Sequence, residues 1–277
     1  MAIKIAMTVR NRLSITKKAI EALHKNTKSD FQLYIYDNLS NYKVREHWEY
    51  FWNLYSNNLV SQVTFNSKES TFNAFSKAVA LNSFGLNHNQ DPNKKKYDFL
   101  TFIDNDIIVT PNWDLIIKGA WQDIKENNIK NIYVISQLPG GIKFKKNVPN
   151  KIAGCEAKIG KLGGSAFWNV KTNFFDEIGF LNMKKLVGLN KKHDQFYWQK
   201  LHEASNGHEY ILGINKKLCV HVGGLAGSVC NILSAGGNEK ERLKKSKLEQ
   251  QERIIESMSY DEFYDKVIND KKYIDGW

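Results

Sequence analysis

The chain has 277 residues, of which 42% are hydrophobic and 12% aromatic, which is enough for one large domain and excludes a wholly disordered chain. It carries 40 basic and 29 acidic residues, a formal net charge of +11. Its three cysteines have no CxxC or Cys/His metal spacing, so neither a disulfide framework nor a zinc site is expected. No signal peptide or membrane-spanning run is expected either, and the predicted location is cytoplasmic.

The surplus of positive charge is concentrated in the second half of the chain. Residues 140–217 contain 14 basic and 6 acidic side chains, a difference of +8. A positive field of this kind attracts polyanions or phosphorylated ligands. Lysine accounts for 35 of the 40 basic residues, so an AT-rich genome explains the same count, and both interpretations stay open at this point.

In the first half, short apolar runs alternate with segments of helical periodicity. This alternation predicts βαβ units, a largely parallel sheet and an α/β fold. We expect Ser14 to be the N-cap of the first helix. The expected strands span 3–9, 31–37, 60–65 and 97–103, the expected helices span 15–23, 44–55 and 71–81, and residues 85–96 are expected to form a polar loop.

The second half is less regular. A helix at 113–126 and a strand at 131–136 are followed by a long stretch, 137–164, that is rich in glycine and lysine and lacks periodicity; we expect a functional or mobile connection there. Strands at 165–170, 210–214 and 218–222 and helices at 174–178 and 195–205 come next. The predicted organisation is a first half (1–136), a second half of the same domain (137–237) and a helical C-terminal tail (238–277).

Polar residues follow the predicted strands at the points where ligands bind in open α/β sheets. Asp104-Asn105-Asp106 is the most informative cluster, because two unpaired carboxylates repel unless a cation lies between them. Mg²⁺ or Mn²⁺ removes that repulsion, and the phosphates of a nucleotide complete its ligands. The alternative is a solvated acidic turn, and burial of these carboxylates against an arginine would contradict the metal hypothesis.

The ordered motifs resemble the GT-A fold glycosyltransferases, in particular the large inverting group that uses nucleotide sugars. The resemblance covers about residues 1–225 and lies in the joint order of motifs that are individually loose. The matching segments are Ile3-Lys-Ile-Ala-Met-Thr-Val, Tyr34-Ile-Tyr-Asp-Asn-Leu-Ser, Asn73-Ala-Phe-Ser-Lys-Ala, Phe102-Ile-Asp-Asn-Asp, Leu162-Gly-Gly-Ser-Ala-Phe and His193-Asp-Gln-Phe.

The resemblance implies a metal-dependent enzyme that moves a sugar from a nucleoside diphosphate sugar, preferably a UDP-sugar, to an acceptor hydroxyl with inversion; retention stays open. It implies a Mn²⁺ or Mg²⁺ site at Asp104, Asp106 and His221. The implied nucleotide-sugar contacts are Thr8, Arg10, Asp37, Lys77, Asp104, Asn105, Gly163 and Gly164. The corresponding structural alternatives are a turn cap for Asp37, a solvated lysine for Lys77, a tight turn for Gly163 and Gly164, and an ordinary structural histidine for His221.

Asp194 matches the second position of the Glu-Asp pair in that group, whose Asp acts as general base, although His193 replaces the Glu. Its alternative role is to cap the helix at 195–205. Trp168 and Trp198 are predicted to offer stacking faces to the acceptor, and placement in the core is the alternative for both.

The expected acceptor is acidic: a hydroxymethylated base in DNA, or alternatively a bacterial surface polysaccharide or lipid-linked glycan. A non-catalytic nucleic-acid-binding protein would explain the charge but leave Asp104, Asp106 and Asp194 without a purpose. A nucleotidyltransferase would usually have glycine after the first strand, where Thr8-Val-Arg-Asn-Arg has none. Neither GxGxxG nor GxxxxGK[ST] occurs, which disfavours dinucleotide oxidoreductases and P-loop enzymes.

Overall fold

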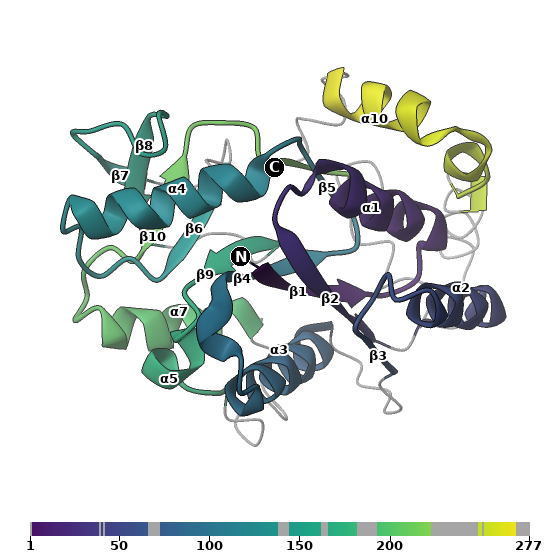
Figure 1. Ribbon diagram of the computed structural model, residues 1–277, viewed down its shortest axis with the longest axis horizontal. Coiled ribbons are helices and arrows are strands. Elements are labelled where there is room, and N and C mark those ends of the chain that lie inside the picture. Colours follow the sequence, from purple (N-terminus) through teal and green to yellow (C-terminus); the bar gives the residue numbers. More distant parts are fainter. Residues whose placement is uncertain are drawn as a thin grey trace, which may run out of the picture.

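A computed structural model describes residues 2–38, 40, 42–65, 73–137, 144–161, 166–181, 193–222, 249–250 and 252–269, without the side chains of 73–77, 144–145, 193–196 and 198. This part of the chain forms a nine-stranded sheet in the order β3-β2-β1-β4-β9-β6-β10-β8-β7 (Figure 1). Its strands are β1 (Ala2–Val9), β2 (Asp30–Asp37), β3 (Gln62–Phe65), β4 (Tyr97–Asp104), β6 (Val134–Gln137), β7 (Phe144–Asn147), β8 (Ala157–Gly160), β9 (Phe167–Val170) and β10 (Ile211–Ile214).

The strand directions bring the carboxyl ends of several strands, and the polar residues that follow them, to one edge of the sheet. β1 pairs in parallel with β2 and β4, β2 with β3, and β6 with β10, whereas β9 is antiparallel to both β4 and β6. The carboxyl ends of β1, β2, β4, β6 and β10 therefore lie at the same edge, which we call the carboxyl edge. A separate two-stranded ladder pairs β5 (Ile107–Val109) with β11 (Cys219–His221) directly beyond β4.

Helices cover both faces of the sheet (Figure 1). Strand β1 explains the two layers, because alternate residues of a strand point to opposite faces. Its Ile3, Ile5 and Met7 belong to one buried cluster, and Ala6 belongs to the other. The first cluster packs against α1 (Leu13–Asn26), α2 (Val44–Ser56), α4 (Trp113–Glu126) and α10 (Tyr260–Asn269), and the second against α3 (Asn73–Gln90), α5 (Phe174–Ile178) and α7 (His193–Ala204).

The α/β fold class is confirmed, and the predicted helices at 113–126 and 174–178 have the observed bounds. Regular structure occurs in both segments that were expected to lack it, 85–96 and 137–164. Residues 85–90 continue α3, because Phe84 and His88 are both buried, and a short 3₁₀ helix, η1 (Lys94–Lys96), follows. The stretch 137–164 contains β7 and β8. Strand β8 forms because its backbone N–H and C=O groups pair with those of β10, about 50 residues further along the chain.

The described C-terminal residues are part of the main body. Tyr260, Phe263 and Val267 of α10 enter the first buried cluster. Glu252 is 1% exposed, and its carboxylate accepts hydrogen bonds from the Ser14 backbone N–H (3.1 Å) and from Ser14 Oγ (2.6 Å). Ser14 is therefore not the N-cap as predicted: Arg12 occupies that position, and a distant carboxylate satisfies the first turn of α1. The predicted division at 136/137 and 237/238 remains a prediction.

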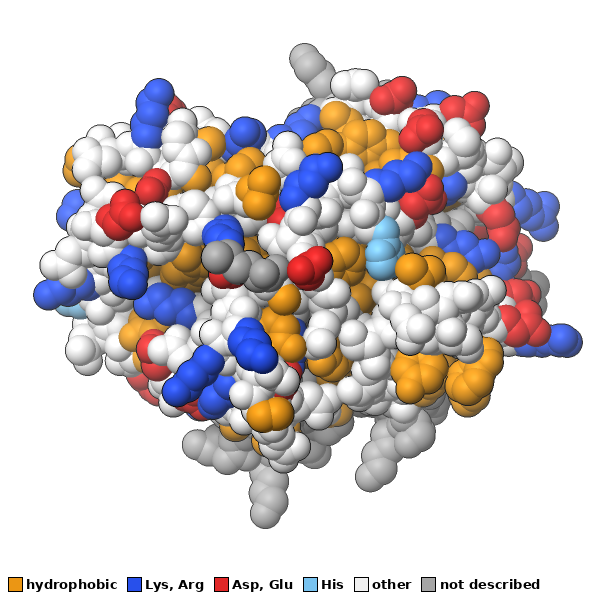
Figure 2. Space-filling view, in the orientation of Figure 1, with side chains coloured by type: hydrophobic (Ala, Val, Ile, Leu, Met, Phe, Trp, Pro, Cys, Tyr) orange, Lys and Arg blue, Asp and Glu red, His pale blue; other side chains and the backbone are white. Residues whose placement is uncertain are grey.

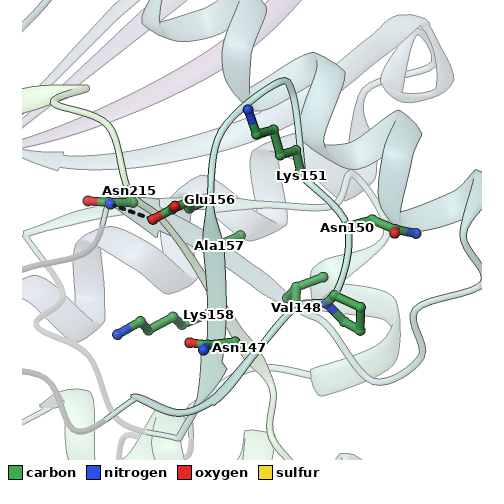
Figure 3. Close-up of a pocket in the computed structure, with 9 residues that line it drawn as sticks. Asn147, Val148, Asn150, Lys151, Glu156, Ala157, Lys158 and Asn215 are labelled. Carbon is green, nitrogen blue, oxygen red and sulfur yellow. Dashed lines mark hydrogen bonds between the residues drawn. The ribbon is translucent and has the colours of Figure 1, made fainter.

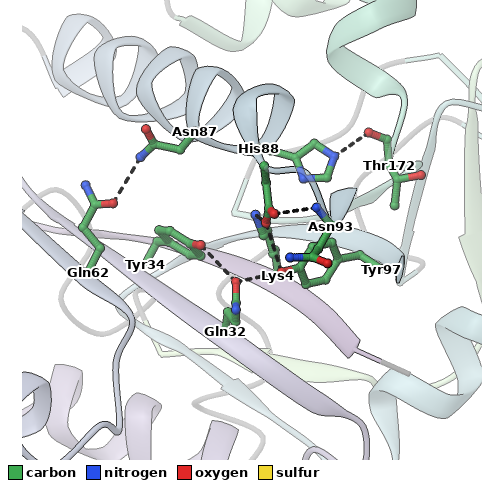
Figure 4. Close-up of polar contacts among 10 residues, drawn as sticks. Lys4, Gln32, Tyr34, Gln62, Asn87, His88, Asn93, Tyr97 and Thr172 are labelled. Atoms are coloured by element: carbon green, nitrogen blue, oxygen red, sulfur yellow. Dashed lines mark hydrogen bonds and ion pairs between the residues drawn. The ribbon is translucent and has the colours of Figure 1, made fainter. Parts of the chain in front are cut away.

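A buried lysine holds the opposite, amino edge of the sheet together (Figure 4). Lys4 is 1% exposed; its Nζ lies 2.5 Å from Asp91 Oδ2 and 4.6 Å from the centre of the Tyr97 ring. Tyr97 Oη in turn donates to Gln32 Oε1. The aromatic rings and the carboxylate together compensate the buried ammonium group, as a buried charge requires.

In the described part of the chain, no helix has both the length and the apolar character needed to cross a bilayer. Cys155 and Cys219 are both free thiols.

Candidate functional site

The carboxyl ends of β1 and β4 lie side by side and bring three of the predicted residues together. Thr8 faces Asp104 in the β1–β4 register, and Thr8 Oγ1 donates a 2.7 Å hydrogen bond to Asp104 Oδ1. The backbone N–H of Asn105 donates to the Thr8 carbonyl at 3.1 Å. Parallel pairing thus fixes a hydroxyl and a carboxylate at the carboxyl edge.

Asp37, at the end of β2, extends this polar group by one strand. It is 3% exposed, faces Val9 of β1 in register, and accepts a hydrogen bond at Oδ1 from the Ser40 backbone N–H (2.8 Å). Burial raises the pKa of Asp37, and the hydrogen bonds from Ser40 and the charge of Arg10 offset only part of that rise. Arg10 therefore acts electrostatically on Asp37, and the assignment of both to the nucleotide pocket stays a prediction.

A buried histidine lies beneath Asp37 and was not anticipated from the sequence. His47 Nδ1 is 3.8 Å from Asp37 Oδ2, and the imidazole is fully buried on the inner face of α2. Burial, together with the charges of Lys17 and Lys43, lowers the pKa of His47 to about 4, so the ring is neutral at pH 7. The only signal in the sequence was its apolar neighbour one turn later, Phe51.

Asp106 forms the centre of the site and lies against Arg12 and His221. Its Oδ2 lies 2.6 Å from Arg12 Nη2 and 3.0 Å from His221 Nε2, and its side chain is 5% exposed. Burial alone would raise the pKa of Asp106, but the charge of Arg12 and the hydrogen bond from His221 outweigh it and hold that pKa well below its usual range. Burial lowers the pKa of His221, yet its bond to Asp106 and the charges of Asp106 and Asp104 raise it overall.

An unusual backbone places Arg12 against Asp106. Asn11 and Arg12 both have left-handed conformations, with φ of 54° and 56°, which costs non-glycine residues roughly 1–3 kcal/mol each. Several hydrogen bonds hold this segment: Asn11 N–H donates to Ser40 Oγ (2.7 Å), Asn105 Nδ2 donates to the Asn11 carbonyl (3.1 Å), and the Tyr42 N–H donates to Asn11 Oδ1 (3.1 Å). Strain maintained by such bonds is typical of functional sites.

The β5–β11 ladder brings in His221 from the second half of the chain. His221 faces Ile107 in this ladder, and the Val222 N–H donates to the Asp106 carbonyl at 2.8 Å. The predicted trio of Asp104, Asp106 and His221 is therefore assembled around the turn that follows β4.

The trio nevertheless does not fit a divalent ion in the described arrangement. Carboxylate oxygens and an imidazole nitrogen suit Mn²⁺ chemically, but Arg12 and His221 both engage the same oxygen of Asp106. Within the described residues, no three acidic, histidine or cysteine side chains are arranged to hold a metal. Arg12 supplies the compensating charge of Asp106 in this arrangement, and the assignment of Asp104, Asp106 and His221 as metal ligands stays a prediction.

Trp168 does not have the predicted acceptor role. It is 1% exposed and packs edge-to-face on Tyr197 inside the second core cluster, so its ring has no face to offer an acceptor. The reason is its place on β9, a central strand with helices on both sides.

The remaining predicted residues are only partly described. Gly163 and Gly164 lie outside the described residues, as do the side chains of Lys77, Trp198 and Asp194. The backbone of Asp194 lies in the first turn of α7. That helix ends near the amino edge, where Tyr133 Oη donates to the Ala204 carbonyl, so its start, about 15 Å away along the axis, lies toward the carboxyl edge.

Comparison with known proteins identifies the fold. No protein-family model and no curated protein sequence matches the chain. The chain is similar to residues 1–349 of S. aureus TarS, with a TM-score of 0.50 and 15% identity over 88% of this chain and 68% of that one. It is also similar to the mannosyltransferase PcManGT from Pyrobaculum calidifontis in complex with GDP-Man and Mn²⁺, with a TM-score of 0.50 and 8% identity over 96% of this chain and 75% of that one. The fold is that of the GT-A glycosyltransferases.

Proposed function

We propose that this protein transfers a sugar from a nucleoside diphosphate sugar to an acceptor hydroxyl. One observation carries the proposal: in a GT-A fold, Thr8, Asp37 and Asp104 come from three adjacent strands to one edge, next to the buried Asp106 centre. Ligands bind at this edge of open α/β sheets. The complex of PcManGT with GDP-Man supports a nucleotide sugar as donor.

The donor site divides by chemistry. Asp37 and Arg10 form the part assigned to the base, where a carboxylate accepts from a ring N–H. Thr8, Asp104 and Asn105 form the part assigned to the ribose and diphosphate. Arg12 brings a cationic group, and His221 a ring N–H donor, close to where the leaving diphosphate gains charge. Positive groups fixed in that place stabilise the leaving group.

Asp194 is the proposed general base. Its carboxylate takes the proton of the acceptor hydroxyl, the hydroxyl oxygen forms a bond to the anomeric carbon, and the nucleoside diphosphate leaves from the opposite face, which inverts the configuration. The start of α7 toward the carboxyl edge supports this assignment. The complex of PcManGT with Mn²⁺ supports a divalent ion in this reaction, and such an ion would compete with Arg12 for Asp106 Oδ2.

The proposed acceptor is polyanionic, such as hydroxymethylated bases in DNA or, alternatively, an anionic bacterial surface glycan. The support is the ratio of 14 basic to 6 acidic side chains over residues 140–217. In Figure 2, Lys and Arg side chains are scattered over this face of the molecule and do not form one continuous patch.

The test is a screen of UDP- and GDP-sugars by thermal shift and by release of nucleoside diphosphate, each with Mn²⁺ and with EDTA. Asp104→Asn should lose donor binding, whereas Asp98→Asn should keep it, because Asp98 lies on the same strand at the amino edge, paired with Lys118. Donor binding that survives Asp104→Asn would contradict the proposed site. A non-catalytic nucleic-acid-binding protein would release no nucleoside diphosphate with any sugar.

A further inference from the structure

A second concave site lies at the carboxyl edge, at the far end of the sheet from β2. It is a cavity of about 450 Å³ between the end of β7, the loop that follows it, the start of β8 and the residue after β10 (Figure 3). Its polar lining consists of Asn147, Asn150, Lys151, Glu156, Lys158 and Asn215. None of these residues belongs to the donor site described above.

The walls of this cavity are fixed by hydrogen bonds. Asn215 N–H donates to the Glu156 carbonyl at 2.8 Å, and Asn215 Nδ2 donates to the Glu156 carboxylate at 3.3 Å. The loop is anchored at Ile152, which is fully buried, and by the Ala153 N–H, which donates to Asp123 Oδ2 of α4 at 2.6 Å. A site held in this way is formed before a ligand arrives, which reduces the entropy lost on binding.

The charges in the cavity favour an anion. Lys151 and Lys158 lie on opposite sides of Glu156 in Figure 3, and neither has an acidic partner within salt-bridge distance among the described side chains. The Glu156 carboxylate accepts a hydrogen bond from Asn215 and keeps its charge, so two lysines and one glutamate give the lining a net charge of +1. Two separated ammonium groups, with Asn147 beside Lys158 and Asn215 beside Glu156 in Figure 3, suit a ligand that carries more than one negative group along a polar chain.

The size of the cavity distinguishes a glycan from duplex DNA. A volume of about 450 Å³ is that of a small-ligand site. A DNA duplex, in contrast, is bound over roughly 1,000 Å² or more of protein surface. One or a few units of an oligosaccharide fit the concave site, whereas a duplex could present at most a single flipped-out base to it.

The cavity lies within reach of the donor site. Asn215 lines it, and His221, six residues further along the same segment, contacts Asp106. Six residues span at most about 22 Å when fully extended. One extended acceptor molecule can therefore occupy the cavity while another of its units lies near the acidic centre.

We propose that this cavity binds the acceptor, and that the acceptor is a glycan chain with repeated phosphate or carboxylate groups. The proposal rests on the proposed sugar transfer and assigns its acceptor subsite. Lys151 and Lys158 contact the anionic groups, and the amides of Asn147, Asn150 and Asn215 contact hydroxyl groups of the same chain.

The experiment measures binding of labelled chains by fluorescence anisotropy at low and physiological salt. The probes are inorganic polyphosphate, an oligogalacturonate, a neutral dextrin of equal length and a duplex oligonucleotide. We expect one of the two anionic chains to bind. Preference for polyphosphate would indicate a phosphate-containing acceptor, and preference for oligogalacturonate would indicate a carboxylate-containing one. Lys151→Gln/Lys158→Gln should weaken that binding about tenfold, since each exposed ion pair contributes modestly.

Lys95→Gln/Lys96→Gln is the matched control, because it removes the same charge from exposed positions at the amino edge and should leave binding unchanged. Equal weakening by both double variants, equal binding of the dextrin, or preferential binding of the duplex would overturn the proposal. Donor binding by thermal shift is measured on the same proteins. If anionic chains bind through the two lysines but no nucleotide sugar binds, the proposed function fails and the cavity assignment stands.

Discussion

The pairing of Arg12 with Asp106 makes a prediction that can be measured in both stability and ligand binding. Methionine keeps much of the length of the arginine side chain but removes its charge, so Arg12→Met leaves a buried carboxylate without its closest cation. The two side chains are 7% and 5% exposed and their charged atoms are 2.6 Å apart. Solvent cannot replace the lost partner at that burial.

Breaking a buried ion pair from one side costs about 3–5 kcal/mol. For a chain of this size, that corresponds to a fall in melting temperature of roughly 6–15 °C. Because the folded pKa of Asp106 is depressed, the stability it contributes is present above the unfolded pKa of about 3.9 and is lost as the pH falls toward the folded pKa. The destabilisation by Arg12→Met should therefore be fully visible at pH 7.

The assay is thermal and urea unfolding of Arg12→Met, Asp106→Asn and the double variant. Since the double variant buries neither charge, it should recover most of the loss, with a coupling of about 2 kcal/mol or more. Arg45→Met removes an exposed arginine, paired with Glu49 on α2, and should leave the melting temperature unchanged. Additive losses in the double variant would refute the buried pair. Stabilisation of Arg12→Met, but not of the wild type, by Mn²⁺ would show that the arginine competes with a cation.

Three further predictions concern other groups. The wild-type protein should lose up to about 3 kcal/mol of its free energy of unfolding as the pH falls from 6.5 toward 4, because the folded pKa of His47 is lowered and its neutral form is buried. Urea unfolding of His47→Phe should show a weaker dependence on pH. An identical dependence would contradict the buried, neutral state of His47. Lys4→Met should destabilise the protein by about 2 kcal/mol, since Asp91 keeps some contact with water, while activity per folded molecule stays unchanged; a change in donor KM would argue against a purely structural role. Asp194→Asn should lower kcat at least about 100-fold with little effect on donor KM, and an equal loss in donor affinity would point to a structural role.

The sequence predicted what depends on local pattern and on strand direction. The alternation of strands and helices predicted the α/β fold, and the rule that parallel strands end at one edge brought Thr8, Asp37 and Asp104 together. It did not predict partners that come from far along the chain. Glu252 reaches Ser14 across 238 positions, and no periodicity records that contact.

Burial was the second source of error. The aromatic side chain of Trp168 suits either stacking on a ligand or packing in the core. It packs in the core because its strand lies in the middle of the sheet. The alternation of β9 does not distinguish these roles, because helices cover both faces and every residue of the strand is buried. His47 was missed for the opposite reason, since a histidine on a helix rich in charged residues gives no sign of full burial.

The two carboxylates of Asp104-Asn105-Asp106 differ in their state, and this difference limits what the site can do. Asp104 accepts a hydrogen bond from the neutral Thr8 hydroxyl, whereas Asp106 shares one oxygen between Arg12 and His221. A divalent ion that used this oxygen of Asp106 would compete with both Arg12 and His221. Arg12 is also the N-cap of α1, whose first turn is held by Glu252 of the C-terminal segment. The centre of the site and the docked C-terminal residues therefore meet at one helix end.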